Sequence, residues 1–255
     1  MKDQSSYNTA PGPFNLLLIG EPFSGKTTLA MTFPNPGIVD CDLKAQNAIA
    51  FHKARNPAFT FKLVTIDTDD DGKHVEEVAR WPRFLTQCDE LIKDAWVKTI
   101  ILDSGTKIST YLTDYLVVQT SNVKAPLVAG MHIMSESHWY PYNTLIERLI
   151  SKILACGKNV ILTVHLRNEA NEGFRPAMPG ASGKNLGKMF TNYWMCKALA
   201  CNPDAHYPRG ARYLVQSAPD GRLALGSSLP NLPAEFEFKW ESFKQYVPWL
   251  DGGAK

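Results

Sequence analysis

Short apolar runs alternate with longer stretches of mixed polar and apolar residues along this chain. The apolar runs are typical of strands and cover residues 14–19, 37–42, 59–66, 99–103 and 159–165. Several of them are apolar at nearly every position, as expected for strands buried on both faces of a sheet. Strands that alternate with helical stretches favour a parallel sheet. The pattern therefore predicts an α/β fold with a mostly parallel β-sheet flanked by helices.

Two of the intervening stretches have the periodicity of amphipathic helices. In residues 143–156 the apolar side chains recur at helical spacing, with Pro141 before the stretch and Gly157 closing it. The stretch 74–95 is also helical in pattern, and Pro82 starts or kinks a second segment within it. These stretches supply the helices that cover the sheet.

Length and composition set the domain organisation. The chain has 255 residues, of which 44% are hydrophobic, and this is enough for a large buried core. No internal repeat and no clear linker interrupts it. We predict a flexible N-terminal arm over residues 1–13, a single domain over 14–250 and a tail over 251–255. The C-terminal part of the domain, about residues 205–240, has a β-rich pattern.

The charge and the cysteines exclude several classes of protein. A formal net charge of +2 excludes a strongly basic protein but leaves room for a local basic groove. The sequence contains no apolar run of the roughly 20 residues that span a bilayer, and its N-terminus lacks a secretory signal pattern. The odd number of cysteines, five, most of them far apart in the sequence, indicates reduced thiols in the cytoplasm. Cys196, Cys201 and His206 are close in sequence, but a fourth ligand at zinc-site spacing is missing.

The strongest motif is a phosphate loop. Residues 20–27 read Gly-Glu-Pro-Phe-Ser-Gly-Lys-Thr and match the pattern GxxxxGK[ST] at every fixed position. The strand over 14–19 precedes the loop, and a short helix is expected over 28–33, stopped by Pro34 and Pro36. A strand before and a helix after are the structural context that this motif requires.

The backbone N–H groups of such a loop form a nest for phosphate oxygens at a helix N-terminus. We expect Lys26 to reach the β- and γ-phosphates and the Thr27 hydroxyl to ligate Mg²⁺. The expected nucleotide-binding positions are Gly20, Glu21, Pro22, Phe23, Ser24, Gly25, Lys26, Thr27 and Thr28. The loop thus predicts a nucleoside triphosphate and Mg²⁺ as the ligands.

Asp103 is the expected acidic partner of the loop. It ends the apolar strand over 99–103, and ligands of α/β proteins bind at the carboxyl ends of the strands. Its carboxylate can hold Mg²⁺ directly or through water. The next residue is Ser104 and not the Glu that many ATPases place there, so a base for water activation must come from elsewhere.

The strand that ends at Asp40 and Asp42 supplies candidates for this base. We choose Asp42 to polarise the attacking water, with Asp40 as the second candidate. The alternative is that both only cap the following helix, because Asp is a favoured N-cap residue. Thr163 and His165 end a further strand and can sense the γ-phosphate, although a single His is more often structural.

The order of these motifs resembles the RecA-like ATPases. The matching segments are the phosphate loop, the acidic strand end at 40–42, Ile-Ile-Leu-Asp-Ser at 100–104 and Ile-Leu-Thr-Val-His at 161–165. The chain is most similar to a compact phage-encoded branch linked to single-strand annealing and recombination, often described only as AAA-domain or ATP-binding proteins. The resemblance covers roughly residues 14–240. It implies a RecA-like P-loop NTPase core with a β-rich C-terminal extension, and ATP as the nucleotide.

The resemblance also implies roles for individual residues. In that family an acidic residue on the second strand, usually Glu, activates water. The matching Asp42 is one methylene shorter, which implies slow hydrolysis. The resulting catalytic set is Lys26, Asp42, Asp103 and His165, and the metal ligands are Thr27 and Asp103.

Single-stranded DNA is the partner that the resemblance implies. The family places DNA-binding loops where this chain has residues 121–138 and 166–190. The second segment contains Phe174 among the basic residues Arg167, Arg175, Lys184 and Lys188. Basic residues contact phosphates and an aromatic side chain stacks on bases. The alternative is an ordinary solvated surface loop.

RecA-like ATPases assemble as rings or filaments, so the resemblance implies a homo-oligomer. A basic residue of a neighbouring subunit then completes the site. The candidates are Lys188, Arg209, Arg212 and Arg222. The resemblance further implies a single-strand-binding protein as a partner and the host cytoplasm as the location of a phage-encoded protein. The lack of a bilayer-spanning apolar run predicts no membrane association.

Two alternative functions remain open at the level of the sequence. A nucleoside or nucleotide kinase would need an acceptor pocket and a lid, for which residues 166–190 are the candidate. A nucleotide-gated DNA-binding module with little hydrolysis would agree with Asp42 in place of Glu.

Overall fold

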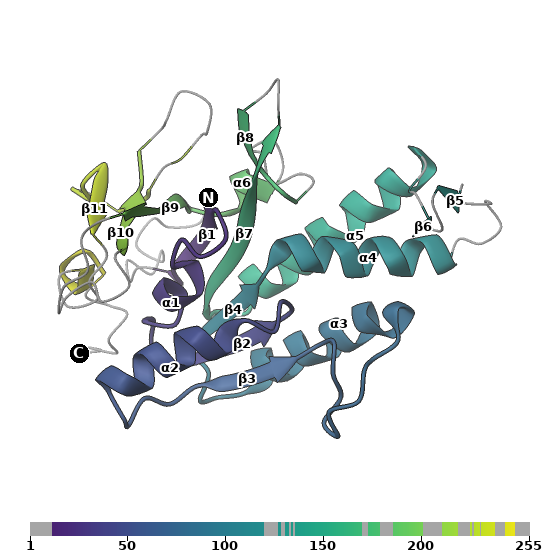
Figure 1. The fold of residues 1–255 in the computed structure, drawn as a ribbon, viewed down its shortest axis with the longest axis horizontal. Coiled ribbons are helices and arrows are strands. Elements are labelled where there is room, and N and C mark those ends of the chain that lie inside the picture. Colours follow the sequence, from purple (N-terminus) through teal and green to yellow (C-terminus); the bar gives the residue numbers. More distant parts are fainter. Residues whose placement is uncertain are drawn as a thin grey trace, which may run out of the picture.

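The computed structural model describes residues 12–119, 127–128, 131–132, 134, 136–169, 173–178, 186–200, 211–218, 225, 227–229, 231–237 and 243–247 (Figure 1). The tail 251–255 and residues 1–11 of the predicted arm lie outside the described residues. The predicted division into arm, domain and tail therefore stays a prediction.

Helices and strands alternate along the described chain. The strands of the main sheet are β1 (Asn15–Gly20), β2 (Pro36–Asp40), β3 (Lys62–Thr65), β4 (Thr99–Asp103), β7 (Asn159–Glu169), β8 (Gly173–Pro176), β9 (Asn192–Ala200), β10 (Ala211–Gln216) and β11 (Glu235–Glu237). The helices are α1 (Lys26–Ala30), α2 (Ala45–Arg55), α3 (Glu77–Lys93), α4 (Gly105–Gln119), α5 (Glu136–Leu154), α6 (Leu186–Met189) and the 3₁₀ turn η2 (Lys244–Tyr246). A separate hairpin consists of β5 (Leu127–Val128) and β6 (Met131–His132).

The main sheet is mostly parallel. Within the described residues its strand order is β11-β10-β9-β1-β7-β4-β2-β3, and β8 pairs with the far end of β7. All pairs from β9 to β3 are parallel, whereas β10, β11 and β8 are antiparallel to their neighbours. In Figure 1, β10 and β11 lie on the opposite side of β1 from β4 and β2. The predicted α/β fold with a mostly parallel sheet flanked by helices is confirmed.

Alternating residues of β1 enter two separate cores, one on each face of the sheet. Leu17 and Ile19 pack with apolar side chains from α3, α4 and α5. Leu16 and Leu18 pack with side chains of α1 and α2 and with Phe243 near the C-terminus. All four β1 side chains have no exposed area, and this burial on both faces explains why the strand is apolar at every position.

Several element boundaries differ from the sequence predictions. The helix after the phosphate loop is Lys26–Ala30 and not 28–33, because the carbonyl oxygen of Gly25 already accepts a hydrogen bond from the Leu29 N–H. The helix predicted over 143–156 begins at Glu136 and contains Pro141. The strand that we expected to end at Asp42 ends at Asp40, so Asp42 lies in the following loop.

The strand with Thr163 and His165 also differs from its prediction. β7 continues to Glu169 and pairs with β8 beyond the edge of the parallel strands, so His165 lies within the strand and not at its end.

Among the described residues, no helix is long and apolar enough to cross a membrane.

Candidate nucleotide site

The phosphate loop connects the buried strand β1 to helix α1, as its sequence context predicts. Gly20 ends β1, and a Cβ atom there would lie 2.5 Å from Ser24 Oγ and 2.6 Å from the carbonyl oxygen of Cys196. Gly25 has φ +85°, a left-handed conformation that glycine adopts without strain. Phe23 is also left-handed, with φ 64°, and its side chain is 85% exposed. Alternating left- and right-handed residues point successive N–H groups into one concave nest.

Lys26 is folded against the loop that carries it. Its ammonium donates hydrogen bonds to the carbonyl oxygens of Gly20 at 2.9 Å and Glu21 at 2.8 Å. Burial lowers the pKa of Lys26, and the nearby carboxylates of Asp103 and Asp42 oppose this shift. A buried ammonium between a phosphate nest and two carboxylates is suited to a ligand that carries several negative charges.

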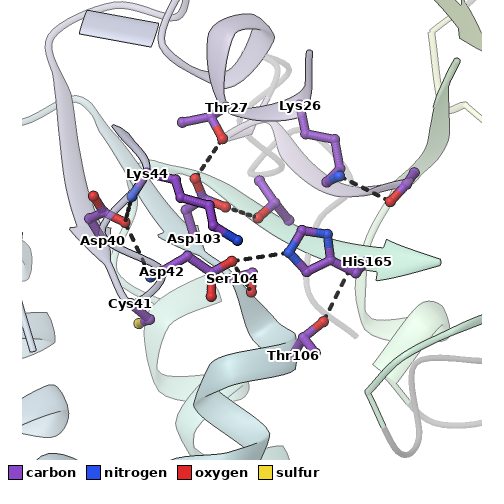
Figure 2. Close-up of polar contacts among 12 residues, drawn as sticks. Lys26, Thr27, Asp40, Cys41, Asp42, Lys44, Asp103, Ser104, Thr106 and His165 are labelled. Carbon is purple, nitrogen blue, oxygen red and sulfur yellow. Dashed lines mark hydrogen bonds and ion pairs between the residues drawn. The ribbon is translucent and has the colours of Figure 1, made fainter. Parts of the chain in front are cut away.

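Thr27 and Asp103 come together at the carboxyl edge of the sheet. The Thr27 hydroxyl donates a hydrogen bond of 2.6 Å to Oδ2 of Asp103 (Figure 2). The Thr163 hydroxyl of β7 donates to the other oxygen, Oδ1, of the same carboxylate. Asp103 is buried, and the two hydroxyls hold its carboxylate at the mouth of the phosphate loop.

The donor set of this pair fits Mg²⁺, which prefers hard oxygen ligands and retains several waters or phosphate oxygens. Thr27 would bind the ion directly, and Asp103 would bind it directly or through water. Among the described residues, no three His, Cys, Asp or Glu side chains are grouped to hold a metal ion by themselves. A site with one hydroxyl and one carboxylate therefore depends on the phosphates to complete the coordination.

Asp42, His165 and Ser104 form a second polar group beside the metal-binding pair. Nε2 of His165 lies 3.0 Å from Oδ2 of Asp42, and the Ser104 hydroxyl donates to the same oxygen at 3.0 Å (Figure 2). Burial alone would raise the pKa of Asp42, but these two hydrogen bonds, together with charge interactions with His165 and Lys44, outweigh burial, so the pKa is lowered. The backbone N–H of His165 donates to Thr106 Oγ1 at 3.2 Å. The arrangement keeps an ionised carboxylate in the site at neutral pH.

Asp40 has a different role from Asp42. Its carboxylate accepts hydrogen bonds from the backbone N–H groups of Asp42 at 3.2 Å, Lys44 at 3.3 Å and Ala45 at 2.9 Å. These bonds fix the loop between β2 and α2, which agrees with the alternative that an Asp caps the following helix. Burial raises the pKa of Asp40, and the backbone hydrogen bonds oppose this shift. Asp40 is therefore a structural residue that supports the loop of Asp42.

The residues expected to contact DNA lie in segments that the structure describes only in part, so their role stays a prediction. Arg167 and Arg175 occupy paired positions of the β7–β8 hairpin. Lys188 is exposed on α6. Lys184 lies outside the described residues, as do Arg209, Arg222, Cys201 and His206. Most of segment 121–138 and much of 166–190 are outside them as well.

Sequence reasoning missed several residues that support the site. Ser104 was noted only as a departure from Glu, but its hydroxyl binds Asp42. The Tyr111 hydroxyl of α4 lies 2.9 Å from the carbonyl oxygen of Cys41, next to Asp42, and 3.0 Å from Oδ1 of Asp67. The position of Ser104 directly after the acidic strand end is a sequence signal for its contact with Asp42. The contacts of Tyr111 are seen only in the tertiary structure.

A phosphate loop between a buried strand and a helix, with a hydroxyl–carboxylate pair beside it, defines a P-loop nucleotide-binding protein. The family comparison agrees with this class. Residues 13–192 match the AAA domain family, and the chain belongs to that family of P-loop ATPases, which use ATP and Mg²⁺. No protein with curated annotation matches the sequence.

One similar solved structure is that of a KaiC-like protein from the hyperthermophilic archaeon Pyrococcus horikoshii OT3. The identity is 14% and the TM-score is 0.47, over 86% of this chain and 84% of that chain.

Proposed function

We propose that this protein is a Mg²⁺-dependent, RecA-like ATPase that acts on single-stranded DNA in phage recombination or annealing. The observation that supports hydrolysis is the position of Asp42. Its carboxylate accepts a hydrogen bond of 3.0 Å from the hydroxyl of Ser104, the residue directly after Asp103 at the end of β4. A carboxylate suited to orient water thus lies beside the groups that would hold the phosphates and the metal ion.

The residues divide the chemistry among them. The loop N–H groups and Lys26 bind the phosphates, and Lys26 stabilises negative charge on the transferred group. Thr27 and Asp103 hold Mg²⁺, which when bound neutralises charge on the phosphate oxygens. Asp42 orients the attacking water and accepts its proton, and His165 holds the Asp42 carboxylate in place.

Exposed aromatic residues support single-stranded DNA as the partner. Trp139 and Tyr140 are adjacent at the beginning of α5, with 42% and 81% of their areas exposed. Helix α6, which carries the exposed Lys188, packs against α5. Aromatic platforms combined with basic side chains bind single strands by stacking and by phosphate contacts.

We also propose a homo-oligomer, a ring or a filament, in which a basic residue of a neighbour contacts the phosphates. Two of the candidate residues lie within the described part of the chain. Lys188 is exposed on α6, and Arg212 is a residue of strand β10. A single-strand-binding protein would be a partner on the DNA, in the host cytoplasm. Sizing with a non-hydrolysable ATP analogue tests assembly, and a monomer with and without DNA would contradict it.

The decisive experiment compares ATP turnover with no DNA, with single-stranded DNA and with duplex DNA. We expect stimulation by the single strand. The double variant Trp139→Ala/Tyr140→Ala should bind single strands at least about 30-fold more weakly, because each of two stacked bases contributes about 1–3 kcal/mol. Its turnover without DNA should be unchanged.

The matched control is Phe51→Ala, which removes a partly exposed aromatic residue from α2. If ATP turnover does not change when single-stranded DNA is added, the proposal is contradicted. Transfer of phosphate to a nucleoside or nucleotide in place of water would favour the kinase alternative. DNA binding that requires ATP but proceeds without measurable hydrolysis would favour the nucleotide-gated module.

A further inference from the structure

Tyr213 stands at the carboxyl edge of the sheet, next to the phosphate loop. Gly20 ends β1 and is in register with Cys196 of β9, which pairs with Val215 of β10. Two residues further along, Ala198 pairs with Tyr213. Tyr213 therefore lies beyond the end of β1, at the edge where ligands of α/β proteins bind. Val215 packs with apolar side chains of α1 in one core. Because residues two apart in a strand point to the same face, the Tyr213 side chain also lies on the α1 face of the sheet.

The Tyr213 ring packs directly against the loop. A Cβ atom built on Gly25 would lie 3.0 Å from Cδ1 of the Tyr213 ring and 3.3 Å from Cγ. Only a residue without a side chain permits this approach at φ +85°. The Tyr213 side chain is half-buried, so part of the ring remains accessible beside the loop.

The sheet order indicates which part of a nucleotide would reach this ring. Asp103 ends β4 and Asp42 lies in the loop after β2, and both strands lie on one side of β1. Strands β9 and β10 lie on the other side (Figure 1). The groups that bind the metal ion and orient water define the γ-phosphate end of the site. Tyr213 lies at the opposite end, toward the nucleoside.

We propose that the Tyr213 ring is the binding surface for the nucleobase of the triphosphate. This inference rests on the proposed nucleotide-dependent function of the same site. A flat aromatic ring binds bases by stacking, and stacking tolerates every base because each has a π-face. The Tyr213 contact therefore favours binding of nucleoside triphosphates in general over inorganic polyphosphate.

The test compares ATP with inorganic tripolyphosphate, which has the same phosphate chain and no nucleoside. Dissociation constants of both ligands with Mg²⁺ are measured for the full chain and for Tyr213→Ala, Tyr213→Leu and Tyr213→Phe. We expect the Ala variant to bind ATP on the order of tenfold more weakly and tripolyphosphate unchanged. The Phe variant retains the ring and should bind both ligands as the original chain does.

Two outcomes would overturn the inference. If the Ala variant loses affinity for ATP and tripolyphosphate equally, Tyr213 only supports the loop. If it loses affinity for neither ligand, the base binds elsewhere. If the Ala variant does not fold, the Leu variant retains bulk against Gly25 without a π-face and gives the same comparison. Failure of the original chain to bind either ligand would instead contradict the proposed function itself.

Discussion

Nε2 of His165 lies 3.0 Å from Oδ2 of Asp42 and joins β7 to the loop after β2. These strands are separated in the sheet by β4, which contributes Asp103 and the following Ser104. Both hydrogen bonds to Asp42, from His165 and Ser104, go to Oδ2. These two hydrogen bonds therefore fix the orientation of the carboxylate through Oδ2. The other oxygen, Oδ1, is suited to accept a hydrogen bond from a water molecule.

Replacement of Asp42 by Asn should abolish most turnover and spare binding. The amide cannot accept a proton from water, and a general base contributes about 10²–10⁴-fold to a rate. Because the pKa of Asp42 is lowered, the carboxylate of the original chain is ionised at neutral pH. The full loss of turnover should therefore be measurable at neutral pH. Steady-state ATP turnover and the dissociation constant of a non-hydrolysable ATP analogue measure the two effects. Unchanged turnover would move the role to another group.

Replacement of Asp40 by Ala should lower stability. Asp40 is 1% exposed, and its carboxylate accepts hydrogen bonds from three backbone N–H groups, which would be left unsatisfied. The expected cost is about 1–3 kcal/mol in the free energy of unfolding, measured by denaturant titration. Asp69→Ala is the matched control, because Asp69 accepts the N–H groups of Asp71 and Lys73 in an exposed turn. A similar loss in both variants would show that burial of Asp40 is not the cause.

Replacement of Thr27 should change the Mg²⁺ requirement. Thr27→Ala removes the hydroxyl that contacts Asp103, whereas Thr27→Ser retains it. We expect the Ala variant to need on the order of tenfold more Mg²⁺ for half-maximal turnover, about the effect of one lost interaction with a charged group. The Ser variant should stay close to the original chain. Equal Mg²⁺ requirements in the two variants would exclude Thr27 as a ligand.

The sequence was a good guide wherever local pattern and chain direction decide the structure. The apolar run 99–103 is a strand with the same bounds, since every side chain in it is buried. The phosphate loop and Asp103 meet because they lie at the carboxyl ends of two parallel strands, and these ends share one edge of the sheet. Helix α2 was missed because it has almost no amphipathic pattern and buries mainly small residues.

Contacts between distant segments could not be derived in the same way. The sequence analysis chose Asp42 as the base and Asp40 as the second candidate, but the local pattern does not show what either carboxylate contacts. The end of β2 at Asp40 directs one carboxylate to the backbone of the next loop, while Asp42 meets His165 across the sheet. The approach of Tyr213 to Gly25 depends on the register of β9 and β10, which no local pattern specifies.

Replacement of Gly20 by Ala should disrupt the phosphate loop. The new Cβ would lie 2.6 Å from a backbone oxygen of Cys196, which cannot move without a shift of β9. Overpacking of this kind costs about 1–3 kcal/mol. We expect a lower melting temperature and weaker ATP binding. Gly12→Ala is the control, since nothing lies within 4 Å of its added Cβ, and an equal effect there would contradict the steric explanation.

The affinity for ATP should fall at alkaline pH because of Lys26. Burial lowers the pKa of this ammonium below the ordinary value of 10.5, so the folded protein loses the charge earlier than an exposed lysine does. The triphosphate favours the charged form. Affinity is therefore full below the lowered pKa, falls as the pH rises through it, and binding in that range takes up a proton.

Titration calorimetry in buffers with different ionisation enthalpies measures this proton uptake between neutral pH and pH 10.5. The control is Lys26→Met, which has a side chain of similar length without a charge and should show weaker binding with no such uptake. Constant affinity up to the ordinary lysine value, or equal proton uptake in the Met variant, would contradict the assignment of Lys26 to the phosphates.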